Sequence, residues 1–66
     1  MNTKSINKST EAFKRNLFHE ADVLHAEAVE NYELGFTTVA DDFANRFDYI
    51  LGLLSRMGWD KEYMGI

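Results

Sequence analysis

The 66-residue sequence contains no cysteine and no proline, and it has only four glycines. Without cysteine, no disulfide can supplement a small core, and the redox compartment is left open. Without proline, no helix is interrupted by a missing backbone donor. No apolar run reaches the roughly 18 residues of a membrane span, and there is no signal-peptide core. We therefore expect a soluble, cytoplasmic protein without a membrane partner.

Motifs for catalysis or cofactor binding are also absent. No glycine-rich phosphate loop is present, and Ser55 has no histidine near it in sequence. Asp22 and His25 have the spacing of helical metal ligands, but the second helix brings no carboxylate to its buried face. We expect no catalytic, cofactor or metal site, and we predict that this chain is not an enzyme.

Apolar residues with helical spacing run from about Ser9 to Leu34. Ser9 or Thr10 is the predicted N-cap, and Gly35 is placed to end the helix in a left-handed conformation. The apolar face spreads over an arc of about 160° at 100° per residue. Its members are Phe13, Leu17, Phe18, Ala21, Leu24, Ala28, Val29 and Tyr32.

A second helical segment is predicted from about Val39 to Met57. Thr38 is the expected N-cap, with Asp41 at the third helical position as in a capping box. Gly58 provides the end of the helix, and Trp59 then falls where it can contact Leu54. The apolar face covers about half of the helix circumference. It comprises Val39, Ala40, Phe43, Ala44, Phe47, Ile50, Leu51, Leu53, Leu54 and Met57.

Together these segments predict an all-α fold, an antiparallel helical hairpin over 9–34 and 39–57 within a single domain of residues 1–66. Residues 1–8 are expected to form a flexible leader. The tail, residues 59–66, should fold back over the overhanging end of the longer first helix near Phe13.

Each apolar face is wider than the two positions in seven that a two-helix seam requires. We therefore predict a homodimer that forms a four-helix bundle. The expected interface residues are Phe18, His25, Val29, Tyr32, Phe47 and Leu51. His25 lies within the apolar arc, where it is either a partly buried core histidine or a pH-sensitive group at the interface.

Charge is distributed unevenly. Residues 1–15 carry a net charge of +3 and residues 16–48 a net charge of −7, within a total of −4. The hairpin would gather acidic residues at its turn. As possible partner-binding residues we select Glu30, Glu33, Asp41 and Asp42 at the turn, and Asn45, Asp48 and Gly52, with Ser55, on the outer face of the second helix. A mid-helix glycine such as Gly52 costs about 1 kcal/mol relative to alanine. It is either an unoptimised surface position or a place where a neighbouring backbone or a partner comes close.

These patterns favour a small non-enzymatic regulator that docks on a larger cytoplasmic protein of the host or cell. Short acidic chains of this kind are common in phage and plasmid genomes, and such an origin is one hypothesis. The layout resembles small hairpin regulators that dimerise into four-helix bundles, such as plasmid copy-number modulators that bind RNA. Those proteins present a basic and polar bundle face, which this sequence lacks.

Two alternatives involve nucleic acid. A dimer could bind it through the basic N-terminal region, although no basic stripe follows either helix, so this partner is not favoured. The residues concerned are Lys4, Lys8, Lys14 and Arg15. Alternatively, the chain could imitate nucleic acid with its acidic residues, Glu27, Glu30, Glu33, Asp41 and Asp42.

Overall fold

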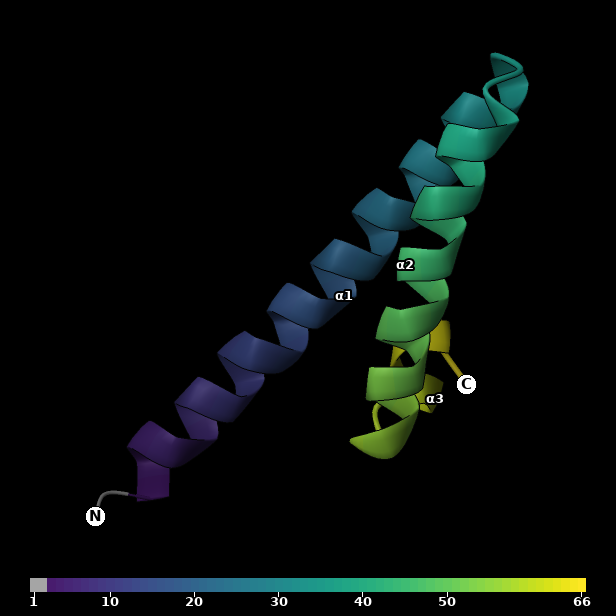
Figure 1. Ribbon diagram of the computed structural model, residues 1–66. Coiled ribbons are helices and arrows are strands. Elements are labelled where there is room, and N and C mark those ends of the chain that lie inside the picture. The colour runs from purple at the N-terminus through teal and green to yellow at the C-terminus, as the bar shows by residue number, and fades with distance from the viewer. Residues whose placement is uncertain (1–2) are drawn as a thin grey trace.

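The chain forms an antiparallel helical hairpin followed by a short third helix (Figure 1). The computed structural model describes residues 3–66, with their side chains from Ser9 onwards. Helix α1 spans Thr3–Glu33, α2 spans Thr37–Arg56 and α3 spans Asp60–Met64. The packing of two long helices against each other confirms the predicted hairpin.

Helix α1 begins earlier than predicted. Ser9 and Thr10 lie inside the helix, so neither is its N-cap, and residues 3–8 continue α1 instead of forming a separate leader. A capping residue stabilises a helix end without forcing one, and no proline or glycine precedes Gly35 to stop the helix. Residues 1 and 2 of the predicted leader lie outside the described part of the chain.

Both long helices end at the predicted glycines. Gly35 and Gly58 have φ angles of 84° and 75°, in the left-handed region that glycine adopts without strain. The amide of Phe36 donates to the carbonyl of Asn31, and the amide of Trp59 donates to that of Leu54, each at 2.8 Å. These bonds define a Schellman motif at each end, with an aromatic residue directly after the glycine.

The start of α2 differs from the sequence prediction. Its N-cap is Phe36, which makes no side-chain capping bond, so the predicted capping box of Thr38 and Asp41 does not form. The reason lies in the preceding turn. The Phe36 amide is still bonded to α1, while its carbonyl already accepts the amide of Ala40 at 2.9 Å. The connection is therefore so short that α2 must begin at Thr37.

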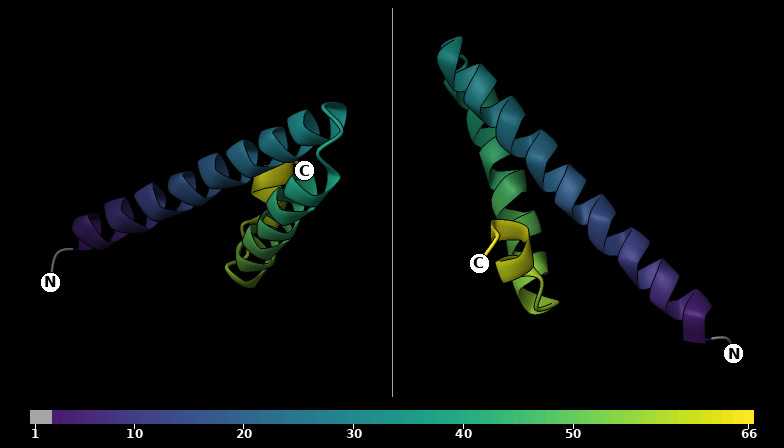
Figure 2. Two further views of the ribbon diagram at one scale, coloured as in Figure 1. Left: turned by 45° about the horizontal axis from the view of Figure 1, so that its top comes forward. Right: turned by 180° about the vertical axis from the view of Figure 1, so that it is seen from behind.

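The two long helices are closest at the turn and diverge towards the N-terminal end of α1 (Figures 1 and 2). Small residues such as Ala28 and Ala40 are buried in the half nearest the turn, where they permit close approach. Ala21, Leu24 and Leu54 complete the buried core. Leu54 is the one large side chain among the described residues that is fully buried.

Helix α3 packs across the diverging end of the hairpin, as the tail was predicted to do. The Trp59 ring meets Phe13 edge-on with centroids 6.1 Å apart, and the Tyr63 ring lies 5.3 Å from that of Phe18. The Tyr63 hydroxyl donates to Asp22 at 2.8 Å. Where the two long helices separate, alanine side chains are too small to fill the space between them. The aromatic side chains of these contacts fill it instead.

The molecule is elongated, with extents of 50 × 20 × 16 Å. Its radius of gyration is 14.4 Å, against about 11 Å for a compact domain of this length. It exposes 5041 Å², whereas a compact monomer of this mass would expose roughly 4,300 Å². The hairpin therefore leaves more surface available for a partner than a compact domain would. None of the described helices has the length and apolar character needed to cross a membrane.

Candidate functional site

The turn between α1 and α2 has a backbone fixed by hydrogen bonds. The Gly35 amide donates to the carbonyl of Tyr32 at 3.1 Å, beside the Phe36 bond to Asn31. The Asn31 side chain in turn donates to the carbonyl of Glu27 at 2.8 Å. A turn held in this way presents its side chains in a defined arrangement, which lowers the entropy lost when a partner binds.

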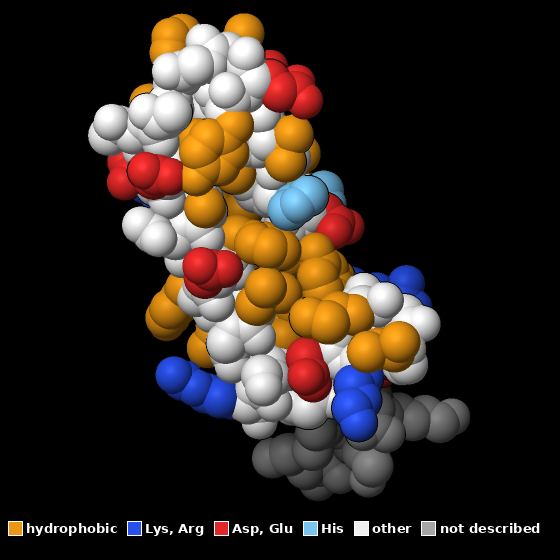
Figure 3. All heavy atoms as spheres, turned by 90° about the vertical axis from the view of Figure 1, so that its right-hand side faces the viewer, with side chains coloured by type: hydrophobic (Ala, Val, Ile, Leu, Met, Phe, Trp, Pro, Cys, Tyr) orange, Lys and Arg blue, Asp and Glu red, His pale blue; other side chains and the backbone are white. Residues whose placement is uncertain are grey.

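Several apolar side chains at this turn are exposed. Leu34 is 61% exposed and Phe36 is 56% exposed, and Val39 lies beside them with nearly half of its surface in solvent. We call these three residues the turn-end apolar group. Hydrophobic side chains reach the tip of the hairpin at the top of Figure 3 and form a band along the molecule below it. From the sequence we selected the acidic residues here but not this apolar group, although the run Leu34-Gly35-Phe36 was the available signal.

Acidic residues surround the turn-end apolar group. Glu30, Glu33 and Asp42 are exposed, as predicted for a charged tip. Asp41 differs, because it accepts a short hydrogen bond from the Tyr32 hydroxyl and so links the two helices. This bond to the carboxylate raises the pKa of Tyr32 above its ordinary value. Asp41 thus has a structural task in addition to its charge.

The outer strip of α2 is open. Asn45, Asp48 and Ser55 are exposed, and Gly52 is partly covered. A Cβ atom added at Gly52 would meet nothing within 4 Å. No neighbouring element therefore requires a glycine at this position within the hairpin.

The predicted dimer residues do not form one uniform open face. His25, Val29 and Tyr32 are exposed on α1, so His25 is not part of the core of one hairpin, and its place at a dimer interface stays a prediction. His25 sits at the edge of the helix pair, with its ring 5.2 Å from that of Phe47. Phe18, Phe47 and Leu51 are half-buried, and Phe18 is already in contact with α3.

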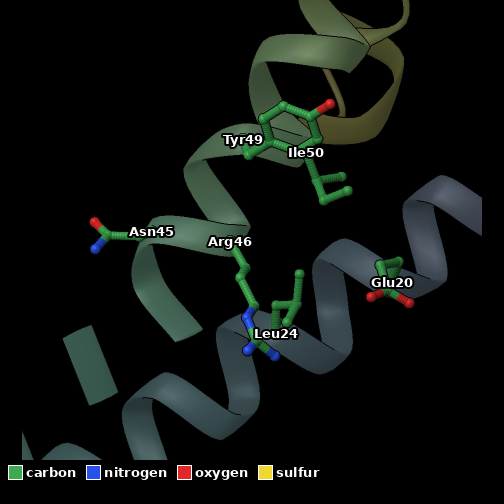
Figure 4. A pocket seen from close by; sticks show the side chains of 6 residues that line it. All are labelled: Glu20, Leu24, Asn45, Arg46, Tyr49 and Ile50. Atoms are coloured by element: carbon green, nitrogen blue, oxygen red, sulfur yellow. The ribbon is translucent and has the colours of Figure 1, made fainter. Parts of the chain in front are cut away.

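The structure also contains a groove that the sequence did not suggest. It lies between α1 and α2, has a volume of about 350 Å³, and is largely apolar (Figure 4). Leu24 and Ile50 line it, with Glu20 on the α1 side and Arg46 on the α2 side; Asn45 and Tyr49 complete the lining. Tyr49 is 65% exposed although it adjoins apolar surface. Helical periodicity placed Leu24 and Ile50 on buried faces, but the groove depends on the distance between the two helices.

The basic N-terminal region is partly neutralised within the chain. The Lys14 ammonium lies 2.6 Å from a Glu62 carboxylate oxygen and 3.0 Å from one of Glu11. Hydrogen bonds to Glu62 and then Glu11 raise the pKa of Lys14 above its ordinary value. Arg15 is exposed, and its Nε atom lies 4.0 Å from a carboxylate oxygen of Glu11. The side chains of Lys4 and Lys8 lie outside the described residues.

Within the described residues, histidine and acidic side chains do not gather in groups that could hold a metal ion. Comparison with models of protein families, with curated proteins and with solved structures gave no match for this chain. The surfaces described above are therefore the observations on which a functional proposal must rest.

Proposed function

We propose that this chain is a non-enzymatic interaction protein that docks on a larger protein through the turn end of its hairpin. The observation that carries the proposal is the exposure of Leu34 and Phe36 on a turn whose backbone is fixed. Aromatic residues, phenylalanine included, are enriched in protein interfaces relative to the rest of the protein surface.

The surrounding charge defines the partner further. Glu30, Glu33 and Asp42 would attract a basic surface and speed the encounter, while the turn-end apolar group would enter an apolar pocket on it. The partner surface is thus an apolar depression with lysine or arginine at its rim. A regulator of a larger cytoplasmic protein would use such a contact, and the phage or plasmid origin stays a hypothesis beside it.

Self-association belongs to the same proposal. The extended surface and the small buried core favour a pair of hairpins that assemble into a four-helix bundle. Nucleic-acid binding is less well supported, because Lys14 is engaged by two carboxylates of its own chain. An acidic mimic of nucleic acid would not need exposed Leu34 and Phe36 among its charges.

The proposal is tested by capture from a host lysate with the full chain immobilised, at low and high salt. The apolar test variant is Phe36→Ala. The charge test variant is Glu30→Gln with Glu33→Gln and Asp42→Asn. Asp41 is left unchanged, because its bond to Tyr32 helps to hold the helices together.

A matched control raises the net charge by the same amount as the charge variant, but on the outer face of α1, with Ser9→Lys, Ala12→Lys and Asn16→Lys, all at exposed positions. We expect one protein to be captured by the parent chain and by this control. The Phe36→Ala variant should capture much less of this protein than the parent chain does. The charge variant should capture less of it mainly at low salt, because salt screens exposed charges. Equal capture by all variants would reject the turn end, and captured RNA or DNA would favour the nucleic-acid alternative.

A further inference from the structure

The groove between α1 and α2 has opposite charges on its two sides. Glu20 lies on α1 and Arg46 lies on α2, with Leu24 and Ile50 between them (Figure 4). The ion pairs among the described residues involve Lys14 and Arg15, and Glu20 and Arg46 take part in none of them. The Arg46 guanidinium instead lies 5.8 Å from the centre of the Phe43 ring. The groove therefore presents one acid and one base whose charges are not matched inside the hairpin.

We infer that this groove is the interface with a second copy of the chain, in which Glu20 of each copy pairs with Arg46 of the other. The inference rests on the self-association proposed above and assigns it a different surface from the one predicted by the sequence. A two-fold axis along the groove places α1 of one copy over α2 of the other. The same axis matches acid to base twice, as a self-complementary interface requires.

The shape of the groove fits the same occupant. Tyr49, 65% exposed at its edge, supplies an aromatic side chain that projects from the surface. A groove of about 350 Å³ lined by Leu24 and Ile50 supplies the apolar space to receive one. Each copy thus offers both a projecting ring and a cavity. Burial of the groove would also cover apolar surface that α3, packed on Phe13 and Phe18, does not reach.

The arrangement has a consequence for docking. An axis along the groove leaves the two hairpins parallel, so both turn ends lie at the same end of the dimer. Two turn-end apolar groups side by side would bind a partner with two such pockets more tightly than either hairpin alone, through effective concentration.

Sedimentation equilibrium of the full chain from micromolar concentration upwards tests the inference. The parent chain should be a dimer. Glu20→Arg and Arg46→Glu should each weaken dimerisation at least about tenfold, because each brings like charges together twice. The double variant that carries both substitutions should recover an affinity within about threefold of the parent. Circular dichroism establishes that each variant remains helical.

Mixing the two single variants provides the decisive measurement. Each variant alone carries like charges at both positions, whereas opposite charges meet only between one variant and the other. We therefore expect the mixture to form a heterodimer from two weakly associating chains. An effect of these charges within one hairpin could not produce this recovery.

The control variant, Val29→Glu, changes an exposed position of the other interface, the one that was predicted from the sequence. It should leave dimerisation unchanged. A dimer that is disrupted by Val29→Glu and is insensitive to both groove variants would overturn the groove assignment while keeping the proposed self-association. A parent chain that stays monomeric at all concentrations would overturn both.

Discussion

The two ends of the hairpin are built from the same local motif but differ in what covers it. At the turn end, Gly35 is followed by Phe36, and at the α3 end Gly58 is followed by Trp59. Both glycines are left-handed, and both aromatic amides bond back into the preceding helix at 2.8 Å. Yet Phe36 is 56% exposed, whereas Trp59 is half-buried against Phe13.

The difference arises from the unequal lengths of the long helices. Helix α1 extends past the end of α2, so Trp59 and α3 find a surface on which to pack. Nothing in the described chain extends past the turn, so Phe36 remains in solvent. A Schellman motif thus fixes the backbone around an aromatic residue, but it does not decide whether that residue serves the core or a partner.

The largest expected difference between the two ends concerns leucine. Leu54→Ala removes the fully buried side chain next to the α3 end and should lower the free energy of unfolding by about 2–5 kcal/mol. Leu34→Ala at the exposed turn end should change it by less than about 0.5 kcal/mol. Urea denaturation measures both values. Similar losses at the two positions would mean that the turn end is part of the core.

The aromatic residues sharpen the comparison. Trp59→Ala should lower the free energy of unfolding by about 1–2 kcal/mol, less than the roughly 3–5 kcal/mol of a fully buried aromatic residue, because Trp59 is only half-buried. Phe36→Ala should cost less than about 0.5 kcal/mol. A larger loss for Phe36→Ala than for Trp59→Ala would reverse the assignment of the two ends.

The smallest expected effect is a dependence on alkaline pH. Burial, followed by the hydrogen bond to Asp22, raises the pKa of Tyr63 from 10.0 to about 12. Because the folded state holds this proton more tightly, the stabilising contribution is complete below about pH 10 and is lost as the pH rises through 12. Trp59 fluorescence should therefore report loosening of α3 over this range.

Tyr63→Phe is the control for this titration, since it keeps the ring beside Phe18 but cannot ionise. It should show a smaller change over the same range. A residual change is expected from Lys14, whose pKa is also raised by its bond to Glu62. The ion pair between these two residues requires a protonated Lys14, so it is lost when Lys14 deprotonates at alkaline pH. Identical fluorescence titrations of the parent and Tyr63→Phe chains would exclude Tyr63 as the cause.

Much of the candidate site depended on distances that no sequence pattern specifies. The acidic turn followed from charge positions once a hairpin was assumed, and Glu30, Glu33 and Asp42 are indeed exposed there. The Tyr32 bond to Asp41 was not foreseen, because these residues were assigned to different surfaces. The exposure of His25 could not be predicted, because periodicity locates a residue on an arc but does not reveal how much of that arc the second helix covers.

The sequence by itself determined the helical hairpin, the glycine ends at Gly35 and Gly58, and the folding of the tail over Phe13. These follow from local preferences: helical apolar periodicity, left-handed glycine, and the overhang of a longer helix. Only the tertiary structure decided the start of α2 at Thr37, the groove beside Glu20 and Arg46, and the contrast between a covered Trp59 and an exposed Phe36. Those features depend on the separation and angle of elements distant in sequence, which are set by how the side chains of those elements pack against one another.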